Sequence, residues 1–125
     1  MDKQKIKSFT DLEAWKESHK LVLMIYEVTN EFPRDEMFAL VSQLRRAAIS
    51  IVSNIAEGFT RKGSKEKIQF YFIAKGSNVE IQSQLLVAKD LKYLNKENFD
   101  NIANQSIKAN KLIGGLIKYC KNTKY

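Results

Sequence analysis

Residues 43–58 read QLRRAAISIVSNIAEG, and this stretch decides how the chain folds. An apolar residue recurs every three or four positions, which is the period of one face of an α-helix. The apolar positions are Leu44, Ala47, Ala48, Ile51, Val52 and Ile55. A polar stripe of the same period runs beside them and consists of Arg46, Ser50, Asn54 and Glu57. Because small residues fill the middle of this stripe, where a solvated face would carry long charged ones, the stretch predicts a half-buried, hydrogen-bonded seam.

The seam needs partners on a neighbouring helix. Ser77 and Glu80 lie one turn apart in a later segment, and we expect them to meet the stripe from the other side. The predicted seam therefore comprises Arg46, Ser50, Asn54, Glu57, Ser77 and Glu80. We expect its carboxylates to accept hydrogen bonds from Asn54 and from Arg45 or Arg46, since buried charges are rarely left unpaired. Two interpretations stay open: the seam fixes the register of the helices, or part of it, notably Arg46 with the adjacent Arg45, faces a nucleic-acid phosphate or a partner.

The rest of the chain repeats the helical period in three further segments. The four predicted helices span residues 11–31, 36–61, 64–92 and 96–120. Thr10 with Glu13 would form a capping box at the first start, and Asp35, Ser64 and Asn95 are candidate caps for the others. Long amphipathic segments with short connections favour antiparallel neighbours. The chain, residues 1–125, is therefore predicted to be a single all-α domain, an antiparallel up-down four-helix bundle.

The third segment carries more apolar residues than one helix face holds. Its expected core positions are Phe70, Ile73, Ala74, Ser77, Ile81, Leu85, Ala88 and Leu91. Gly76 is expected to let two helices approach closely. Residues 21–26 and 70–74 are continuous apolar runs, which point in every direction on a helix, whereas a bundle core takes about three of every seven positions. The surplus favours contacts between subunits, and we expect a homo-oligomer.

Positive charge is concentrated after residue 36. The net charge is +7, to which residues 1–36 contribute −2 and residues 37–125 contribute +9. Such a surface favours polyanions, and the alternative is a solvated helical face that keeps the protein in solution. The candidate nucleic-acid-binding residues are Arg45, Arg46, Arg61, Lys62, Lys65, Lys67, Lys108 and Lys111. Lys118, Lys121 and Lys124 follow in the same tail, which contains no acid after Asp100.

No set of residues points to a reaction or to a bound cofactor. His19 has no metal-binding neighbour at helical spacing, and the single Cys120 cannot complete a zinc site with it. The sequence has no Gly-rich phosphate loop and no nucleophile with a recognisable base. We therefore expect no catalytic residue, no metal and no cofactor. One cysteine, no signal-peptide pattern and no apolar run of about 20 residues predict a cytoplasmic protein without a membrane span.

Five motifs occur in an order that is typical of one family. They are Asp11-Leu12-x-x-Trp15, Ile25-Tyr26-x-x-Thr29-x-x-Phe32-Pro33, Leu40-x-x-Gln43-Leu44-Arg45-Arg46-Ala47-Ala48-x-Ser50-Ile51, Asn54-Ile55-Ala56-Glu57-Gly58 and Ala74-x-Gly76-Ser77-x-x-Glu80. Over residues 9–120 the chain resembles the four-helix bundle proteins of the 23S rRNA intervening-sequence family, also called S23 ribosomal proteins. It differs at Ala39, where the family often has Gly, and at Asn78, where an apolar residue is usual.

The resemblance implies an antiparallel four-helix bundle that assembles as a ring-shaped homopentamer. Family members are encoded in sequences inserted in bacterial 23S rRNA genes or elsewhere on bacterial chromosomes, and no enzymatic activity is established for them. The accessory variability protein of diversity-generating retroelements is similar in fold and ring, and it binds nucleic acid and a reverse transcriptase. The resemblance assigns no binding residue.

Two functions follow as hypotheses. The first is a basic, non-enzymatic homo-oligomer that binds nucleic acid, with RNA favoured, through backbone phosphates. Because the sequence has no aromatic RNA-recognition motif, we expect weak sequence specificity. The second is a scaffold without a direct nucleic-acid role, which presents its surfaces to a protein partner while its charge serves solubility or steering.

Overall fold

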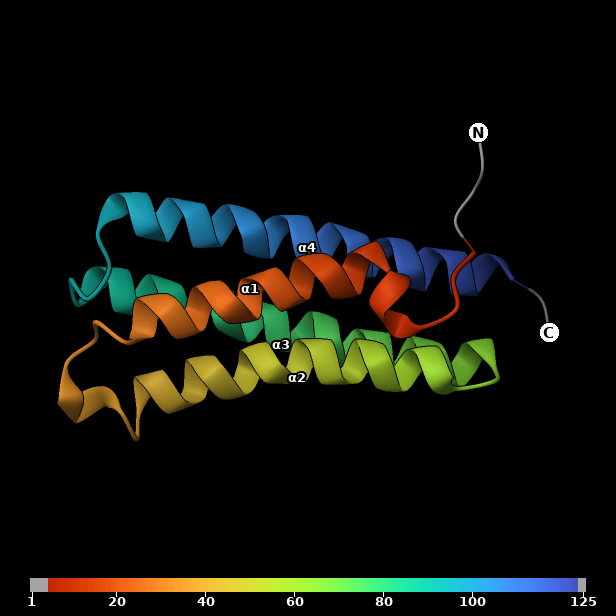
Figure 1. Cartoon of the computed structure of the whole chain (residues 1–125), viewed down its shortest axis with the longest axis horizontal. Helices are drawn as coiled ribbons and strands as arrows, with labels where there is room; N and C mark the ends of the chain where they lie inside the picture. The colour runs from red at the N-terminus through yellow and green to blue at the C-terminus, as the bar shows by residue number, and fades with distance from the viewer. Residues whose placement is uncertain (1–4, 124–125) are drawn as a thin grey trace.

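Four α-helices contain most of residues 5–123, the part of the chain that the computed structural model describes. They are α1 (Glu13–Thr29), α2 (Leu40–Thr60), α3 (Ser64–Asp90) and α4 (Lys96–Asn122), with short 3-10 helices at Phe9–Asp11 and Arg34–Glu36. Consecutive helices run antiparallel (Figure 1), and α1 and α3 each pack against both α2 and α4. The predicted all-α four-helix bundle is confirmed.

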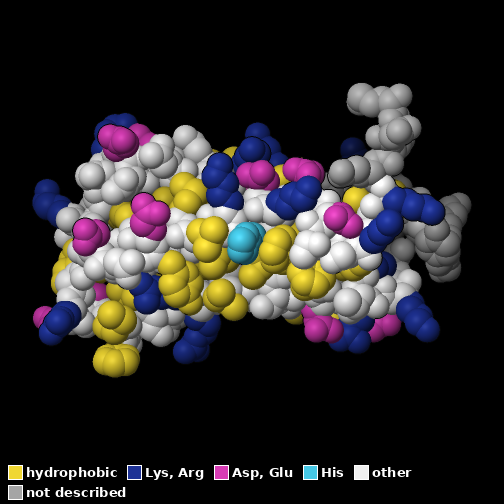
Figure 2. Space-filling view, in the orientation of Figure 1, with side chains coloured by type: hydrophobic (Ala, Val, Ile, Leu, Met, Phe, Trp, Pro, Cys, Tyr) yellow, Lys and Arg dark blue, Asp and Glu magenta, His cyan; other side chains and the backbone are white. Residues whose placement is uncertain are grey.

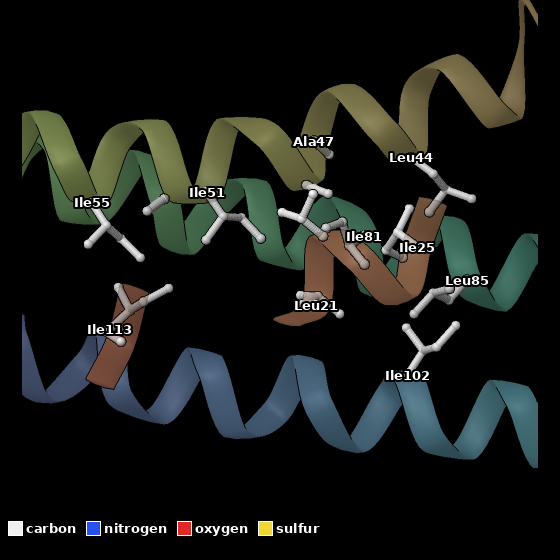
Figure 3. Close-up of a cluster of buried hydrophobic side chains, with 14 of the residues drawn as sticks. Leu21, Ile25, Leu44, Ala47, Ile51, Ile55, Ile81, Leu85, Ile102 and Ile113 are labelled. Atoms are coloured by element: carbon white, nitrogen blue, oxygen red, sulfur yellow. The ribbon is translucent and has the colours of Figure 1, made fainter. Parts of the chain in front are cut away.

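The core runs along the axis of the bundle and takes side chains from every helix. Figure 3 shows Leu21 and Ile25 of α1 facing residues of α2, α3 and α4. The largest fully buried aliphatic side chains are Leu21, Ile25, Leu44, Ile51, Ile55, Ile81, Leu85 and Ile113. Burying one such side chain stabilises the fold by about 1.5–3 kcal/mol. The apolar stripe of residues 44–55 therefore faces the core, as its period predicts.

The first helix begins differently from the prediction. Thr10 does not cap it; instead, the Ser8 hydroxyl accepts a hydrogen bond from the backbone N–H of Thr10 at 3.2 Å. The Asp11 carboxylate accepts from the backbone N–H of Ser8 at 3.0 Å, which closes a capping box around the 3-10 turn. Ser8 and Asp11 have the same three-residue spacing as Thr10 and Glu13, and the earlier pair forms the box. Leu12 is extended, and α1 starts at Glu13.

The second helix begins at Leu40 and not at residue 36. Residues 34–36 form a 3-10 turn, and the expected cap at Asp35 is wrong. The carboxylate of Glu36 accepts from the backbone N–H of Leu40 at 3.3 Å and so occupies one of the free donors at the helix start. The intervening turn leaves the side chain of Phe38 96% exposed.

The ends of the later helices follow the sequence more closely. Gly63, and not Ser64, is the N-cap of α3. That helix ends in a left-handed residue, Lys92 (φ 67°), and the N–H of Tyr93 donates to the carbonyl of Ala88 at 2.9 Å. Asn95 caps α4 as predicted, because its side chain accepts from the backbone N–H of Asn98 at 2.7 Å.

The close approach of two helices occurs at Gly58 and not at Gly76. A Cβ atom on Gly58 would lie 2.7 Å from Cε1 of Tyr71 and 3.0 Å from Cβ of Phe70, so only glycine lets α2 meet α3 there. A Cβ atom on Gly76 would meet nothing within 4 Å. The expectation that Gly76 permits close packing within the bundle is therefore wrong.

A small polar layer interrupts the core between α3 and α4. Asn78 and Ser106 are fully buried. The Asn78 amide nitrogen donates to the carbonyl of Ser106 at 2.9 Å, and the Ser106 hydroxyl donates to the Asn78 side-chain oxygen. Gln82 donates to the Ser106 hydroxyl at 3.0 Å. Because each buried group has its partner only in this register, the layer fixes how α3 sits along α4.

Candidate nucleic-acid interface

Three of the six residues predicted for the seam lie between α2 and α3: Ser50, Asn54 and Ser77. The hydroxyl oxygens of Ser50 and Ser77 lie 2.8 Å apart, and the Asn54 amide donates to the carbonyl of Ser50 at 2.8 Å. Arg46, Glu57 and Glu80 are exposed instead. Their long side chains reach water from the rim of the α2–α3 contact, whereas the shorter Ser and Asn side chains remain between the helices.

The two adjacent arginines have different surroundings. Arg45 turns to the end of α1, where its Nε donates to the Thr29 hydroxyl at 2.9 Å and a terminal nitrogen donates to the Asn30 side chain at 3.1 Å. Its guanidinium also lies 4.5 Å from the centre of the Tyr26 ring. These contacts stabilise the C-terminus of α1. Arg46 is exposed and borders a shallow groove between α1 and α2. The expected hydrogen bond from Arg45 or Arg46 to Glu57 is therefore wrong, because Glu57 pairs with Arg61.

Cationic side chains gather at one end of the bundle, which we call the basic end. The antiparallel topology brings the α2–α3 turn beside the last turns of α4 (Figure 1). Residues 57–67 and 116–123 carry only two carboxylates, those of Glu57 and Glu66. The cationic residues of the basic end are Arg61, Lys62, Lys65, Lys67, Lys118 and Lys121. A pocket of about 280 Å³ lies among Lys62, Ser64, Lys67 and Tyr119.

The charges of the basic end are not equally available to a ligand. Lys67 is half-buried, and its ammonium group donates to the carbonyl of Phe59 at 2.7 Å at the end of α2. Arg61 pairs with Glu57 at 2.7 Å and lies over the Phe70 ring. Lys62 and Lys65 are exposed and form no ion pair with any of residues 5–123. These two lysines are therefore the most accessible cations of the α2–α3 turn.

The remaining predicted residues lie along the outer side of α4. Lys108 is 3.4 Å from the carboxylate of Glu17. Hydrogen bonds from Gln105 and then from Lys108 hold the pKa of Glu17 below its usual range. Lys111 is exposed and shares a shallow groove with Lys75 of α3. The eight predicted residues thus lie in three separate regions and not on one surface.

A family model described as "23S rRNA-intervening sequence protein" matches residues 10–115. This chain belongs to that family. A crystal structure from Bacteroides thetaiotaomicron, of a protein with unknown function from the S23 ribosomal protein family, has a similar fold with a TM-score of 0.78. The two sequences are 24% identical, and the alignment covers 84% of this chain and 95% of that chain, which supports the fold alone. No curated protein sequence matches this chain.

In this member of the intervening-sequence family, three residues of the basic end are not among the eight predicted binding residues. Lys118 and Lys121 were noted only as part of an acid-free tail, and Tyr119 was not considered. Tyr119 is 70% exposed beside these lysines. An antiparallel pairing of α4 with α3 would have placed all three next to the α2–α3 turn, because residues after 116 must then lie near residue 64. Lys124 lies outside the described residues.

His19 and Cys120 are the two residues considered for a metal site on sequence grounds. The His19 ring stacks on Trp15, with 4.8 Å between ring centres. Cys120 is buried, and burial raises the pKa of its thiol. Among residues 5–123, no three His, Cys, Asp or Glu side chains are arranged to hold a metal ion. No helix in that range is both long and apolar enough to cross a membrane.

Proposed function

We propose that this protein is a non-enzymatic homo-oligomer that binds nucleic acid through the basic end. The observation that supports this proposal is the gathering of six cationic side chains against two carboxylates where the α2–α3 turn meets the end of α4. Phosphate groups attract such a cluster without regard to base sequence. The family description refers to a 23S rRNA intervening sequence, and this favours RNA over DNA.

The expected binding mode is electrostatic and has little sequence specificity. The cations of the turn and of α4 are on long side chains at one end of the bundle (Figure 1), and the sequence has no aromatic RNA-recognition motif that would read bases. Tyr119 adds one exposed ring on which a base could stack. Assembly would multiply the charge: the ring-shaped homopentamer that the family resemblance implies would carry +35 from five chains of +7.

Charge reversal within the basic end tests the proposal. We expect Lys62→Glu/Lys65→Glu/Lys118→Glu to weaken the binding of structured RNA in a filter-binding titration at about 50 mM salt. The slope of log K against log salt should fall by about 2–3 in magnitude, if each of the three lysines neutralises one phosphate. The matched control, Lys16→Glu/Lys20→Glu/Lys89→Glu, makes the same change in net charge at exposed lysines outside the basic end.

Two results would overturn this function. The first is no binding of structured RNA by the unmodified protein at low salt. The second is an equal loss of affinity in the triple variant and its control, because that would mean that net charge matters and the basic end does not.

The second candidate is a scaffold for a protein partner, which the exposed apolar side chains of α3 favour. A pull-down that recovers one defined protein after nuclease treatment, together with no RNA binding, would replace the first proposal with this one.

A further inference from the structure

The outer side of α3 is apolar along most of its length. Phe72, Ile73, Val79, Leu86 and Val87 are between 46% and 53% exposed. We call these five residues the α3 ridge. Phe72, Val79 and Leu86 are seven residues apart, so they form one line about 21 Å long down the helix. Soluble proteins rarely leave such a continuous apolar line open to water.

Gly76 interrupts the ridge without a reason inside the bundle. A glycine within a helix costs about 1 kcal/mol relative to alanine. A Cβ atom at position 76 would meet nothing within 4 Å, so the chain's own packing does not require glycine there. The missing side chain exposes the helix backbone between Ile73 and Val79, where another element could pack closely.

A second apolar surface lies between α1 and α2. A shallow groove of about 450 Å³ there is lined by Tyr26, Met37, Phe38, Val41, Arg46 and Ile49. Leu23, one turn before Tyr26 on α1, is 57% exposed. Figure 2 shows a band of hydrophobic side chains along this face of α1 and α2, with the single histidine in its midst. We call this surface the α1–α2 groove.

The two surfaces differ in shape and bear opposite charges. The ridge is the outer side of one helix, whereas the groove is a hollow between two helices. Arg46 borders the groove, and Glu80 lies on the ridge between Ile73 and Val87 in helical phase. Neither residue forms an ion pair with any of residues 5–123. A ridge packed into a groove would bring these opposite charges to one interface.

We propose that the α3 ridge of one copy packs into the α1–α2 groove of the next copy. This inference rests on the homo-oligomer of the proposed function and names the surfaces that build it. A second copy fits because one chain carries both the apolar ridge and the apolar groove, together with unpaired charges of opposite sign. The contact joins unlike surfaces, so an open assembly has one free ridge at one end and one free groove at the other until it closes.

Two variants that block opposite sides of the contact test this arrangement. Val79→Glu/Leu86→Glu blocks the ridge, and Leu23→Glu/Ile49→Glu blocks the groove. All four side chains are at least 42% exposed, so both variants should fold, which circular dichroism checks. Native mass spectrometry should find the unmodified protein assembled and each variant alone monomeric. The control Asn101→Glu/Asn104→Glu changes exposed residues of α4 outside both surfaces and should assemble normally.

The decisive sample is a 1:1 mixture of the two blocked variants. The groove of the first and the ridge of the second are intact, so we expect a dimer with one copy of each and no larger species. A mixture that stays monomeric, or either variant assembling alone like the control, would overturn the ridge-to-groove contact. An unmodified protein that is monomeric at micromolar concentration would overturn the oligomer itself. RNA binding is measured separately by filter binding, so these failures are distinguishable.

Discussion

The inner and outer sides of α3 are both largely apolar, yet packing within the bundle explains only the residues of the inner side. On the inner side, Tyr71 packs against Gly58 and Asn78 bonds to Ser106. On the outer side, a Cβ atom on Gly76 would meet nothing within 4 Å, and Val79 is 53% exposed. The comparison teaches that the fold accounts for the inner half of this helix, whereas the outer half is accounted for only by the proposed contact with a second copy.

The largest expected effect comes from filling the close approach on the inner side. Gly58→Val should lower the free energy of unfolding by about 3 kcal/mol, because the new side chain overlaps Tyr71 and Phe70. Urea unfolding followed by circular dichroism measures the loss. Gly115→Val is the matched control, since a Cβ atom there meets nothing within 4 Å. Equal unfolding midpoints in the two variants would mean that α2 and α3 can move apart at no cost.

A smaller loss is expected from breaking the buried polar layer. Asn78→Leu removes both hydrogen bonds between Asn78 and Ser106. It should lower the free energy of unfolding by about 1–3 kcal/mol. Ser106→Ala should cost less in the Asn78→Leu background than in the unmodified protein, because the Ser106 hydroxyl has already lost its acceptor on Asn78 and keeps only the hydrogen bond from Gln82. The four proteins of this double-mutant cycle are compared by urea unfolding. Strictly additive losses would show that Asn78 and Ser106 do not stabilise each other.

The smallest effect, and the one that separates the two sides of α3 most directly, is expected at Gly76. In the monomeric background Val79→Glu/Leu86→Glu, Gly76→Ala should raise the free energy of unfolding by about 0.5–1 kcal/mol. In the otherwise unmodified protein, the same change should weaken assembly, which dilution followed by native mass spectrometry measures. A loss of stability in the monomeric background would place the reason for Gly76 inside the bundle and contradict the comparison.

Helical period predicted the fold because three of the four helices have a single apolar face. The stripe from Leu44 to Ile55 is an example, and its buried positions are those that the period selects. The same rule failed at Ile73 and Leu91, which were expected in the core and are 52% and 51% exposed. Because α3 is apolar on two sides, period alone does not say which side faces the bundle.

The candidate site was only partly predictable for a related reason. Sequence composition finds cations, but it does not reveal which of them the fold has already engaged. Arg45 is bound to the end of α1 and Lys67 to the end of α2, whereas the neighbouring Arg46 and Lys65 remain exposed. Positions one or two apart on a helix differ by about 100° or 200° in direction, so one residue can point inward while its neighbour points to water.

The contact of Lys67 with the carbonyl of Phe59 has a consequence for recognition. It joins the start of α3 to the end of α2 across a connection of only three residues, Arg61 to Gly63. The backbone that carries Lys62 is therefore already ordered before any phosphate arrives. The proposed binding of nucleic acid would then restrict little more than the side-chain rotamers of the exposed lysines, at about 0.5–1.5 kcal/mol each. Lys67, which is itself engaged by the backbone, would thus lower the conformational entropy that its neighbours lose in the proposed binding.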